Sequence, residues 1–175
     1  MNMLSRLFFP VIVALVSVFF FGTAEAGSPK KMVKQGEAYY ALGRFNEAVA
    51  EFNLAIAEDS RYQQAYYARG KAFYEQQKFR EAIADYDKAI ELKNDCARAF
   101  YHRGLAWEAL QEYTRAAADY DSAIAVRHEY EKALFARGAL RYKLDDRSGA
   151  LDDMKRAAAL GSTKASEWLA EEGTR

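Results

Sequence analysis

An arginine-glycine pair returns along this chain at a fixed interval of thirty-four residues. The pair stands at Arg69-Gly70, Arg103-Gly104 and Arg137-Gly138. Four consecutive blocks of this length follow one another without insertions, over residues 29–62, 63–96, 97–130 and 131–164. Three positions of every block hold only small residues, namely Gly36, Gly70, Gly104 and Gly138; Ala48, Ala82, Ala116 and Ala150; and Ala55, Ala89, Ala123 and Ala157. Self-similarity at a fixed period predicts a repeat architecture in which each unit packs on the next.

Each block is predicted to form two helices joined by a turn. In the second block an apolar stripe follows the three- and four-residue spacing of a helix surface. Its members are Phe79, Ala82, Ile83, Tyr86, Ala89 and Ile90. A glycine inside a helix costs ~1 kcal/mol relative to alanine, so four such glycines indicate a tight contact between the helices of each pair. The sequence therefore predicts an all-α fold.

The pattern resembles the tetratricopeptide repeat, a helix–turn–helix unit of the same length. The resemblance covers Pro29 to Lys164. It implies a right-handed α–α solenoid of four tandem repeats, and Ala165–Glu172 is then expected to begin a C-terminal capping helix, with a tail to Arg175. The turn between the two helices is not uniform. At the same position of the turn, the first block has Gly43, whereas the later blocks have Gln77, Gln111 and Asp145.

The recurring arginines each have an aspartate sixteen residues later in the same block. The pairs are Arg69 with Asp85, Arg103 with Asp119 and Arg137 with Asp153. We expect an exposed ion pair that joins the two helices of each repeat, worth only ~0.2–1 kcal/mol. The alternative is a functional anion site at the arginines.

The first twenty-six residues have the features of a secretory signal peptide. Arg6 precedes the short apolar run of residues 7–21, and Ala24-Glu25-Ala26 supplies a site for cleavage after Ala26. An uncleaved membrane anchor is the alternative, but the run is short for a span and lysines follow it on the side that would be translocated. We therefore expect export to the bacterial periplasm or secretion.

Motifs that carry catalytic or metal chemistry are missing from the sequence. There is no Gly-rich phosphate loop, no nucleophile elbow, no HExxH and no CxxC. Cys96, His102 and His128 have no metal-ligand spacing, and Cys96 as the only cysteine leaves no internal disulfide; an intermolecular disulfide stays open. Basic and acidic residues both number 25, which argues against nucleic acid as a partner. We predict a protein that is not an enzyme and binds no cofactor or metal.

The family resemblance implies a concave groove lined by the first helix of each repeat. The residues expected to line it are Lys34, Glu37, Tyr40, Tyr67, Lys71, Tyr74, Arg98, Tyr101, His102, Glu108, Phe135 and Tyr142. Tyrosine offers apolar area and a hydrogen-bonding tip, which suits recognition surfaces. The alternative is that Tyr67 and Tyr101 simply pack in the core.

The expected ligand of this groove is a peptide with apolar anchors and some negative charge, because basic residues outnumber acidic ones there. The carboxylate clamp known in the family is not matched, since Val33, Glu37 and Ala68 stand where it has lysine and asparagines. Arg98 and His102 are expected to preserve some positive character.

The sequence thus predicts an exported, non-catalytic scaffold that binds a protein or peptide and, after signal cleavage, no membrane. A structural assembly factor that self-associates through its solenoid ends or convex face is the alternative. A monomer or a weak homo-oligomer is expected.

Overall fold

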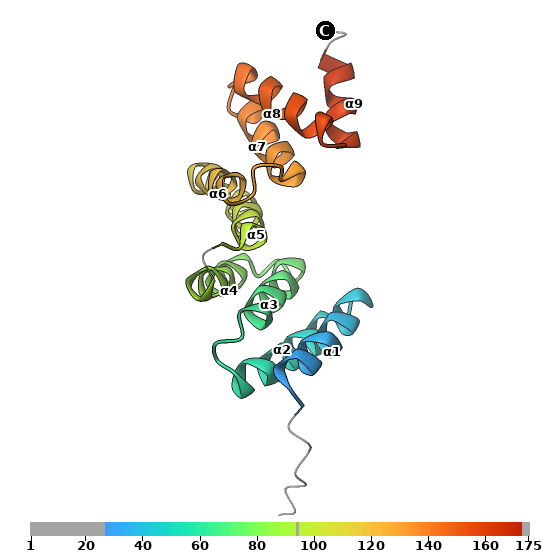
Figure 1. Ribbon diagram of the computed structural model, residues 1–175, viewed down its shortest axis with the longest axis vertical. Helices are drawn as coiled ribbons and strands as arrows, with labels where there is room; N and C mark the ends of the chain where they lie inside the picture. The colour runs from blue at the N-terminus through green and yellow to red at the C-terminus, as the bar shows by residue number, and fades with distance from the viewer. Residues whose placement is uncertain (1–26, 94, 173–175) are drawn as a thin grey trace, which may run out of the picture.

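The computed structural model describes residues 27–93 and 95–172, and these residues form α-helices and no β-strand (Figure 1). The helices are α1 (Pro29–Ala41), α2 (Phe45–Glu58), α3 (Gln63–Glu75), α4 (Phe79–Leu92), α5 (Ala97–Ala109), α6 (Tyr113–Val126), α7 (Glu131–Lys143), α8 (Arg147–Ala159) and α9 (Thr163–Glu172). The predicted all-α solenoid with a capping helix is confirmed. The predicted signal peptide, residues 1–26, lies outside the described residues.

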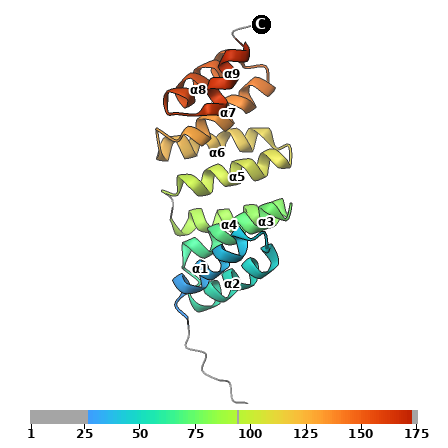
Figure 2. The same ribbon diagram turned by 90° about the vertical axis from the view of Figure 1, so that its right-hand side faces the viewer.

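Successive helices pair into antiparallel hairpins that stack along one long axis. The pairs α1–α2, α3–α4, α5–α6 and α7–α8 make the most extensive contacts, and each hairpin also packs against the next. The first helices touch one another, α1 against α3 and α3 against α5. In Figure 1 the stack curves, and Figure 2 looks onto the side toward which it bends, with α5 crossing the middle of that face.

The repeated glycines are the points where the two helices of a hairpin close on each other. A Cβ atom added at Gly104 would lie 2.6 Å from the ring of Tyr120, and one at Gly70 would lie 2.7 Å from the ring of Tyr86. Both tyrosine rings are fully buried. Since a side chain at these positions would occupy the same space as the ring, the glycines are required by packing, as the sequence predicts.

The turn inside each hairpin places one residue in the left-handed region of backbone conformation. The φ angles are 71° at Gly43, 59° at Gln77, 61° at Gln111 and 65° at Asp145. The residue after it closes the turn, as where the Glu112 N–H donates to the Trp107 carbonyl at 2.9 Å. The first hairpin therefore uses glycine in this turn, whereas the other three use a residue with a side chain. Each of these three residues carries a conformational cost of ~1–2 kcal/mol.

The arginine-aspartate pairs form as predicted, but the expectation that they are exposed is wrong. Arg103 donates two hydrogen bonds to Asp119, at 2.8 and 2.6 Å, and the exposed fraction of Asp119 is only 4%. Asp85 and Asp153 are equally buried and bind Arg69 and Arg137 in the same forked geometry. The carboxylate sits between the packed helices, a position that spacing alone does not reveal.

Each of these arginines also reaches back to the preceding repeat. The third guanidinium contact goes to Asp87 from Arg103 and to Asp121 from Arg137, both at 2.5 Å. Arg69 makes the equivalent bond, at 2.6 Å, to the neutral side chain of Asn53. We call Arg69, Arg103 and Arg137 the arginine ladder. Each member joins three helices, two in its own hairpin and the second helix of the hairpin before.

Protonation of the ladder follows from burial and hydrogen bonding. Burial raises the pKa of the Asp119 carboxyl, and this effect outweighs the opposing effect of the Arg103 guanidinium. The hydrogen bonds to Asp119 raise the pKa of Arg103, so the arginine stays charged. The guanidinium therefore favours the ionised form of the carboxyl against the effect of burial, and a buried charge without that partner would be costly.

The capping helix α9 begins at Thr163, two residues before the predicted start. Ser162 explains the difference, because its Oγ accepts a hydrogen bond from the Ala165 N–H at 3.4 Å, in the manner of a helix N-cap. Trp168 of α9 lies edge-on to Tyr142, with ring centroids 5.2 Å apart. Among the described helices, none is long and apolar enough to cross a membrane.

Candidate functional site: a concave groove on the first helices

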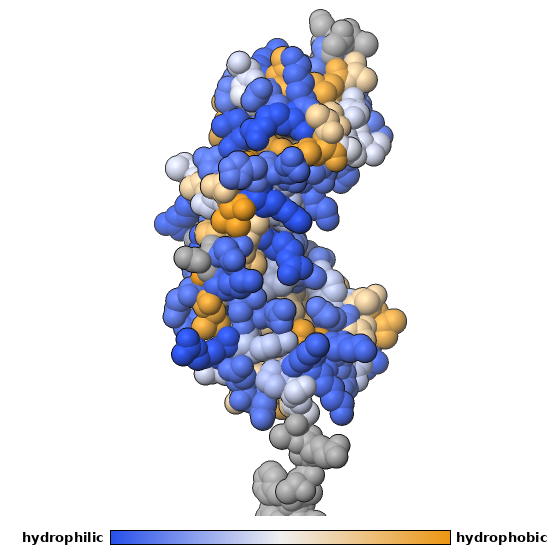
Figure 3. Space-filling model, viewed as in Figure 1, coloured by the Kyte–Doolittle hydropathy of each residue, from blue (hydrophilic) through white to orange (hydrophobic). Residues whose placement is uncertain are grey.

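All twelve residues predicted for the groove lie on the first helices α1, α3, α5 and α7. Every one is exposed or half-buried. The space-filling view in Figure 3 shows the outline of the molecule hollowed between its two ends on the side to which the stack bends. The residues therefore share the first-helix surface of the solenoid, where a ligand could reach them.

Aromatic rings of α3 and α5 contact one another, and a lysine links them to a tyrosine of α1. The ring of Tyr67 meets the ring of His102 edge-on at 5.6 Å, and His102 meets Tyr101 at 5.1 Å. The ammonium of Lys71 lies 4.6 Å from the ring centre of Tyr40 and links the first helix to this group. We call Tyr40, Tyr67, Tyr101 and His102 the aromatic row. Such rings provide rigid apolar area with polar tips at the base of a groove.

Tyr67 and Tyr101 also pack toward the core, which was the alternative interpretation from the sequence. Tyr67 lies 6.1 Å from the buried ring of Tyr86, and Tyr101 lies 5.4 Å from the buried ring of Tyr130. Phe135 packs against the same cluster of buried residues. Each ring thus has one face in the interior and part of its surface in the groove, so packing holds it in place without covering it.

A pocket of about 410 Å³ opens at the N-terminal end of the groove. Its lining includes Lys30, Lys34, Glu37, Tyr62, Tyr67 and Arg98. The Arg98 guanidinium stacks over the ring of Tyr67 at 5.2 Å. Tyr62 was not predicted; it precedes α3, and only its aromatic character at the repeat boundary could have indicated it.

The groove carries positive charge that the described part of the protein does not neutralise. Within residues 27–93 and 95–172, the following basic residues form no ion pair with a carboxylate: Lys30, Lys34, Lys71, Arg98 and Lys132. The groove acid Glu108 and the neighbouring Glu75 are engaged by hydroxyl groups instead, since Glu75 accepts from Tyr40 at 3.0 Å and Glu108 accepts from Tyr120 at 2.8 Å. Burial, and secondarily the bond to Glu75, raises the pKa of Tyr40 to about 12, so its hydroxyl remains a donor.

His102 is neutral at the pH of most biological compartments. Burial, and secondarily the nearby cations Lys71, Lys132 and Arg98, lowers its pKa to about 4. The expectation that His102 preserves positive character is therefore wrong, whereas Arg98 does so. The imidazole instead serves as a polar, uncharged member of the aromatic row.

We expect the stability of the protein to fall as the pH drops from ~6.5 to ~4, partly through His102. The unfolded chain binds a proton at this histidine more readily than the folded chain, so acidification favours unfolding over that range. Urea unfolding as a function of pH measures the effect, and His102→Gln should flatten the part of the profile that this residue causes. An unchanged profile in the variant would contradict a depressed pKa at His102.

The C-terminal end of the groove is partly covered by the capping helix. The Tyr142 hydroxyl donates to Glu172 at 2.7 Å, and its ring meets Trp168. Tyr74 lies edge-on to Phe79 at 5.4 Å and lines a smaller pocket together with Glu108. The groove residues are thus divided between an open cationic end at α1, α3 and α5 and a closed end at α7 and α9.

Within the described ranges, no three His, Cys, Asp or Glu residues are grouped so that they could hold a metal ion. His102 belongs to the aromatic row, and His128 is exposed between α6 and α7. Cys96 is half-buried just before α5 and accepts a hydrogen bond from Gln63 at 3.4 Å.

Stacked helical hairpins with a groove on their first helices define an α-solenoid scaffold of the kind that mediates contacts between proteins. The model of the TPR repeat matches residues 36–77 and 70–111. The TPR domain of Arabidopsis OM64 is 30% identical, with 67% of this chain and 98% of that domain covered and a TM-score of 0.65. This chain belongs to the tetratricopeptide repeat family.

Other solved structures share the fold at lower identity. A crystal structure of MamA is 24% identical, with 82% of this chain and 84% of that chain covered and a TM-score of 0.73. The first TPR domain of Spaghetti (RPAP3), bound to the HSP90 peptide SRMEEVD, is 22% identical, with 69% and 95% covered and a TM-score of 0.66. No curated protein sequence matches this chain.

Proposed function

We propose that this protein is a non-catalytic, exported scaffold that holds an extended or helical segment of a partner protein in its concave groove. The observation that carries the proposal is the aromatic row bordered by Lys34, Lys71 and Arg98, whose charges have no carboxylate partner among the described residues. Aromatic side chains dominate the energy of protein interfaces, and free cations attract a ligand of opposite charge. The segment is therefore apolar with acidic residues.

The peptide held by the Spaghetti domain supports a ligand of this character, because its printed sequence, SRMEEVD, contains two glutamates and a final aspartate. The mode of binding differs, since Val33, Glu37 and Ala68 do not supply the family's carboxylate clamp. Affinity here comes from the rings, and Arg98 with the lysines steers the acidic ligand. The signal-like residues 1–26 support export as the route to the partner.

The double substitution Tyr67→Ala and Tyr101→Ala tests groove binding. Loss of two half-exposed rings is expected to lower the affinity for the partner by roughly tenfold or more, since such residues act as binding hot spots. The partner is first fixed by crosslinking the wild-type protein in its own compartment, and its affinity is then measured by calorimetry.

Tyr66→Ala with Tyr113→Ala is the matched control, because it also removes two half-buried tyrosines, neither of which lies on the groove. Circular dichroism confirms that both double variants remain folded. Equal affinity of the groove variant and the control would sink the proposal. Lys34→Glu with Arg98→Glu separates the charge contribution and should abolish the preference for an acidic segment.

Self-association through the solenoid ends is a second candidate, favoured by exposed leucines at both ends. Leu42 and Leu54 of the first hairpin are 72% and 53% exposed, and Leu151 and Leu160 of the last hairpin are each 39% exposed. Apolar surface of this kind at opposite ends fits head-to-tail contact between copies. Light scattering over a wide concentration range decides the matter, because a strict monomer at high concentration removes this candidate.

A further inference from the structure

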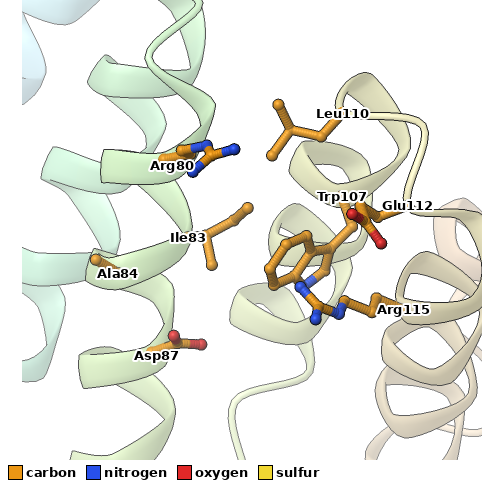
Figure 4. Close-up of a pocket in the computed structure, with 8 residues that line it drawn as sticks. All are labelled: Arg80, Ile83, Ala84, Asp87, Trp107, Leu110, Glu112 and Arg115. Atoms are coloured by element: carbon orange, nitrogen blue, oxygen red, sulfur yellow. The ribbon is translucent and has the colours of Figure 1, made fainter.

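A further pocket, of about 390 Å³, opens between α4, the end of α5 and the start of α6 (Figure 4). The residues that shape it are Arg80, Ile83, Trp107, Leu110, Glu112 and Arg115. None of them belongs to the groove residues described above. Trp107 directly precedes the groove residue Glu108 on α5, so the pocket and the groove use different faces of the same helix.

The repeat register shows that the residues shaping this pocket differ at the other interfaces. One repeat earlier, Asn46 stands in place of Arg80 and Gln76 in place of Leu110. There the Gln76 amide donates to Asn46 at 3.0 Å and joins α3 to α2 across the corresponding space. Between the second and third repeats this bond cannot form, because Leu110 has no polar group to offer Arg80.

The interface between the third and fourth repeats differs in another way. Arg141 takes the position of Trp107, and its guanidinium turns to Asp153 at 2.7 Å. Within residues 29–164, Trp107 is therefore the tryptophan at this repeat position, and the other indole, Trp168, borders a different pocket beside the capping helix.

The floor of the pocket is apolar and fixed by the core. Ile83 is 6% exposed, and it belongs to the buried cluster against which Trp107 and Leu110 pack. Figure 4 shows the side chains of Ile83, Trp107 and Leu110 directed toward the space between α4 and α5. An apolar side chain that enters this space would leave water for a preformed apolar surface, which is favourable in proportion to the area covered.

The rim of the pocket is positively charged. Among residues 27–93 and 95–172, neither Arg80 nor Arg115 forms an ion pair, and the Arg115 guanidinium lies 4.6 Å from the ring centre of Trp107. Asp87, at the same rim, is already bound by Arg103 at 2.5 Å. Glu112 is the remaining acid of the lining and forms no ion pair with another described residue. The rim therefore has two guanidinium groups and one carboxylate that are unpaired within the described residues, and its unpaired charge is positive. Guanidinium groups bind carboxylates with two parallel hydrogen bonds.

We infer that this pocket binds a segment of a partner protein that presents one bulky apolar side chain next to an aspartate or glutamate. The apolar side chain fills the space beside Trp107, and the carboxylate meets Arg80 or Arg115 at the rim. The site is independent of the groove, so the scaffold holds two partners, or two segments of one partner, at once.

The repeat register supplies the variant that tests this inference. Arg80→Asn with Leu110→Gln installs the side chains of the preceding interface and is expected to close the pocket with a bond like that of Gln76 and Asn46. The probe is a random peptide library displayed on phage and selected on the full chain, with this closed variant as counter-selection. Peptides that carry Leu, Phe or Trp beside Asp or Glu are expected to be enriched on the wild type.

Selected peptides that contain Leu or Phe and no tryptophan are then measured on purified variants by the fluorescence of Trp107, in a chain whose other tryptophan is replaced by Trp168→Phe. Affinity should fall by roughly tenfold or more in the closed variant and in Arg80→Glu, because the space or the charge is removed. Tyr67→Ala with Tyr101→Ala should leave this affinity unchanged, which separates the pocket from the groove.

Three results would overturn the inference. One is the absence of any enriched peptide that depends on the open pocket. Another is enrichment of basic or uncharged peptides in its place. The third is a dimer of the wild-type protein that the closed variant abolishes in sedimentation experiments, since the pocket would then accept a second copy of the chain.

Discussion

Replacing Arg103 by methionine is expected to destabilise the protein by about 3–5 kcal/mol, because it leaves the buried carboxylate of Asp119 without its partner. The methionine retains much of the length of the arginine, so the loss reflects charge more than volume. Chemical unfolding followed by circular dichroism measures the difference from the wild type. Arg44→Met is the control, since Arg44 and Glu47 form an exposed ion pair, whose loss is expected to change stability far less than the loss of the buried pair.

Acidification should reduce the defect of the Arg103→Met variant relative to the wild type. Burial raises the pKa of Asp119 in the folded protein, and loss of the guanidinium raises it further. The folded variant then binds a proton at Asp119 more tightly than the unfolded chain, so its relative stability rises as the pH falls through this raised pKa. Adding Asp119→Leu should also restore stability. A defect that is independent of pH and persists in the double variant would contradict this account.

Gly104→Ala is expected to destabilise the protein by about 2 kcal/mol, although alanine is the better helix former. The new Cβ would lie 2.6 Å from the ring of Tyr120, which is fully buried and held by its hydroxyl bond to Glu108. Overpacking a core costs ~1–3 kcal/mol or more, against ~1 kcal/mol gained in helix propensity. The midpoint of urea unfolding measures the net change.

The fourth repeat provides a matched control for this substitution. At Gly138 the corresponding Cβ would lie 3.1 Å from the Cβ of Asp153 and 3.2 Å from the terminal methyl group of the flexible Met154, so its nearest contact is looser than the 2.6 Å at Gly104. Gly138→Ala should therefore cost clearly less than Gly104→Ala. Similar losses at both positions would mean that the tyrosine ring is not what excludes a side chain from the third repeat.

Local spacing was enough to predict the helical hairpins. The interval between Gly70, Gly104 and Gly138 fixes which helices approach closely, and an aromatic ring or a methionine meets each glycine as that packing requires. The first helices begin at Pro29, Gln63, Ala97 and Glu131, in step with this interval. Periodicity succeeds here because each repeat contacts only its neighbours, so local and tertiary structure follow the same register.

Properties that depend on depth or on side-chain direction could not be predicted in the same way. The spacing of Arg103 and Asp119 gave their pairing but not their burial, which arises from the packing of three helices. The charge of His102 depends on burial beside three cations, two of which, Lys71 and Lys132, lie on other helices. The pocket beside Trp107 is open because Arg80 and Leu110 do not form a hydrogen bond across it. That property belongs to the pair of residues, so neither position alone predicts it.

The arginine ladder gives the solenoid unequal mechanical joints. Arg103 and Arg137 tie their hairpins to the preceding ones through a charged aspartate, whereas Arg69 ties the second hairpin to the first through the neutral Asn53. The charged bonds of the second and third joints are open to competition from dissolved ions, because Asp87 and Asp121 are exposed, whereas the neutral bond of the first joint is not. Raising the ionic strength should therefore soften the solenoid at its later joints more than at its first.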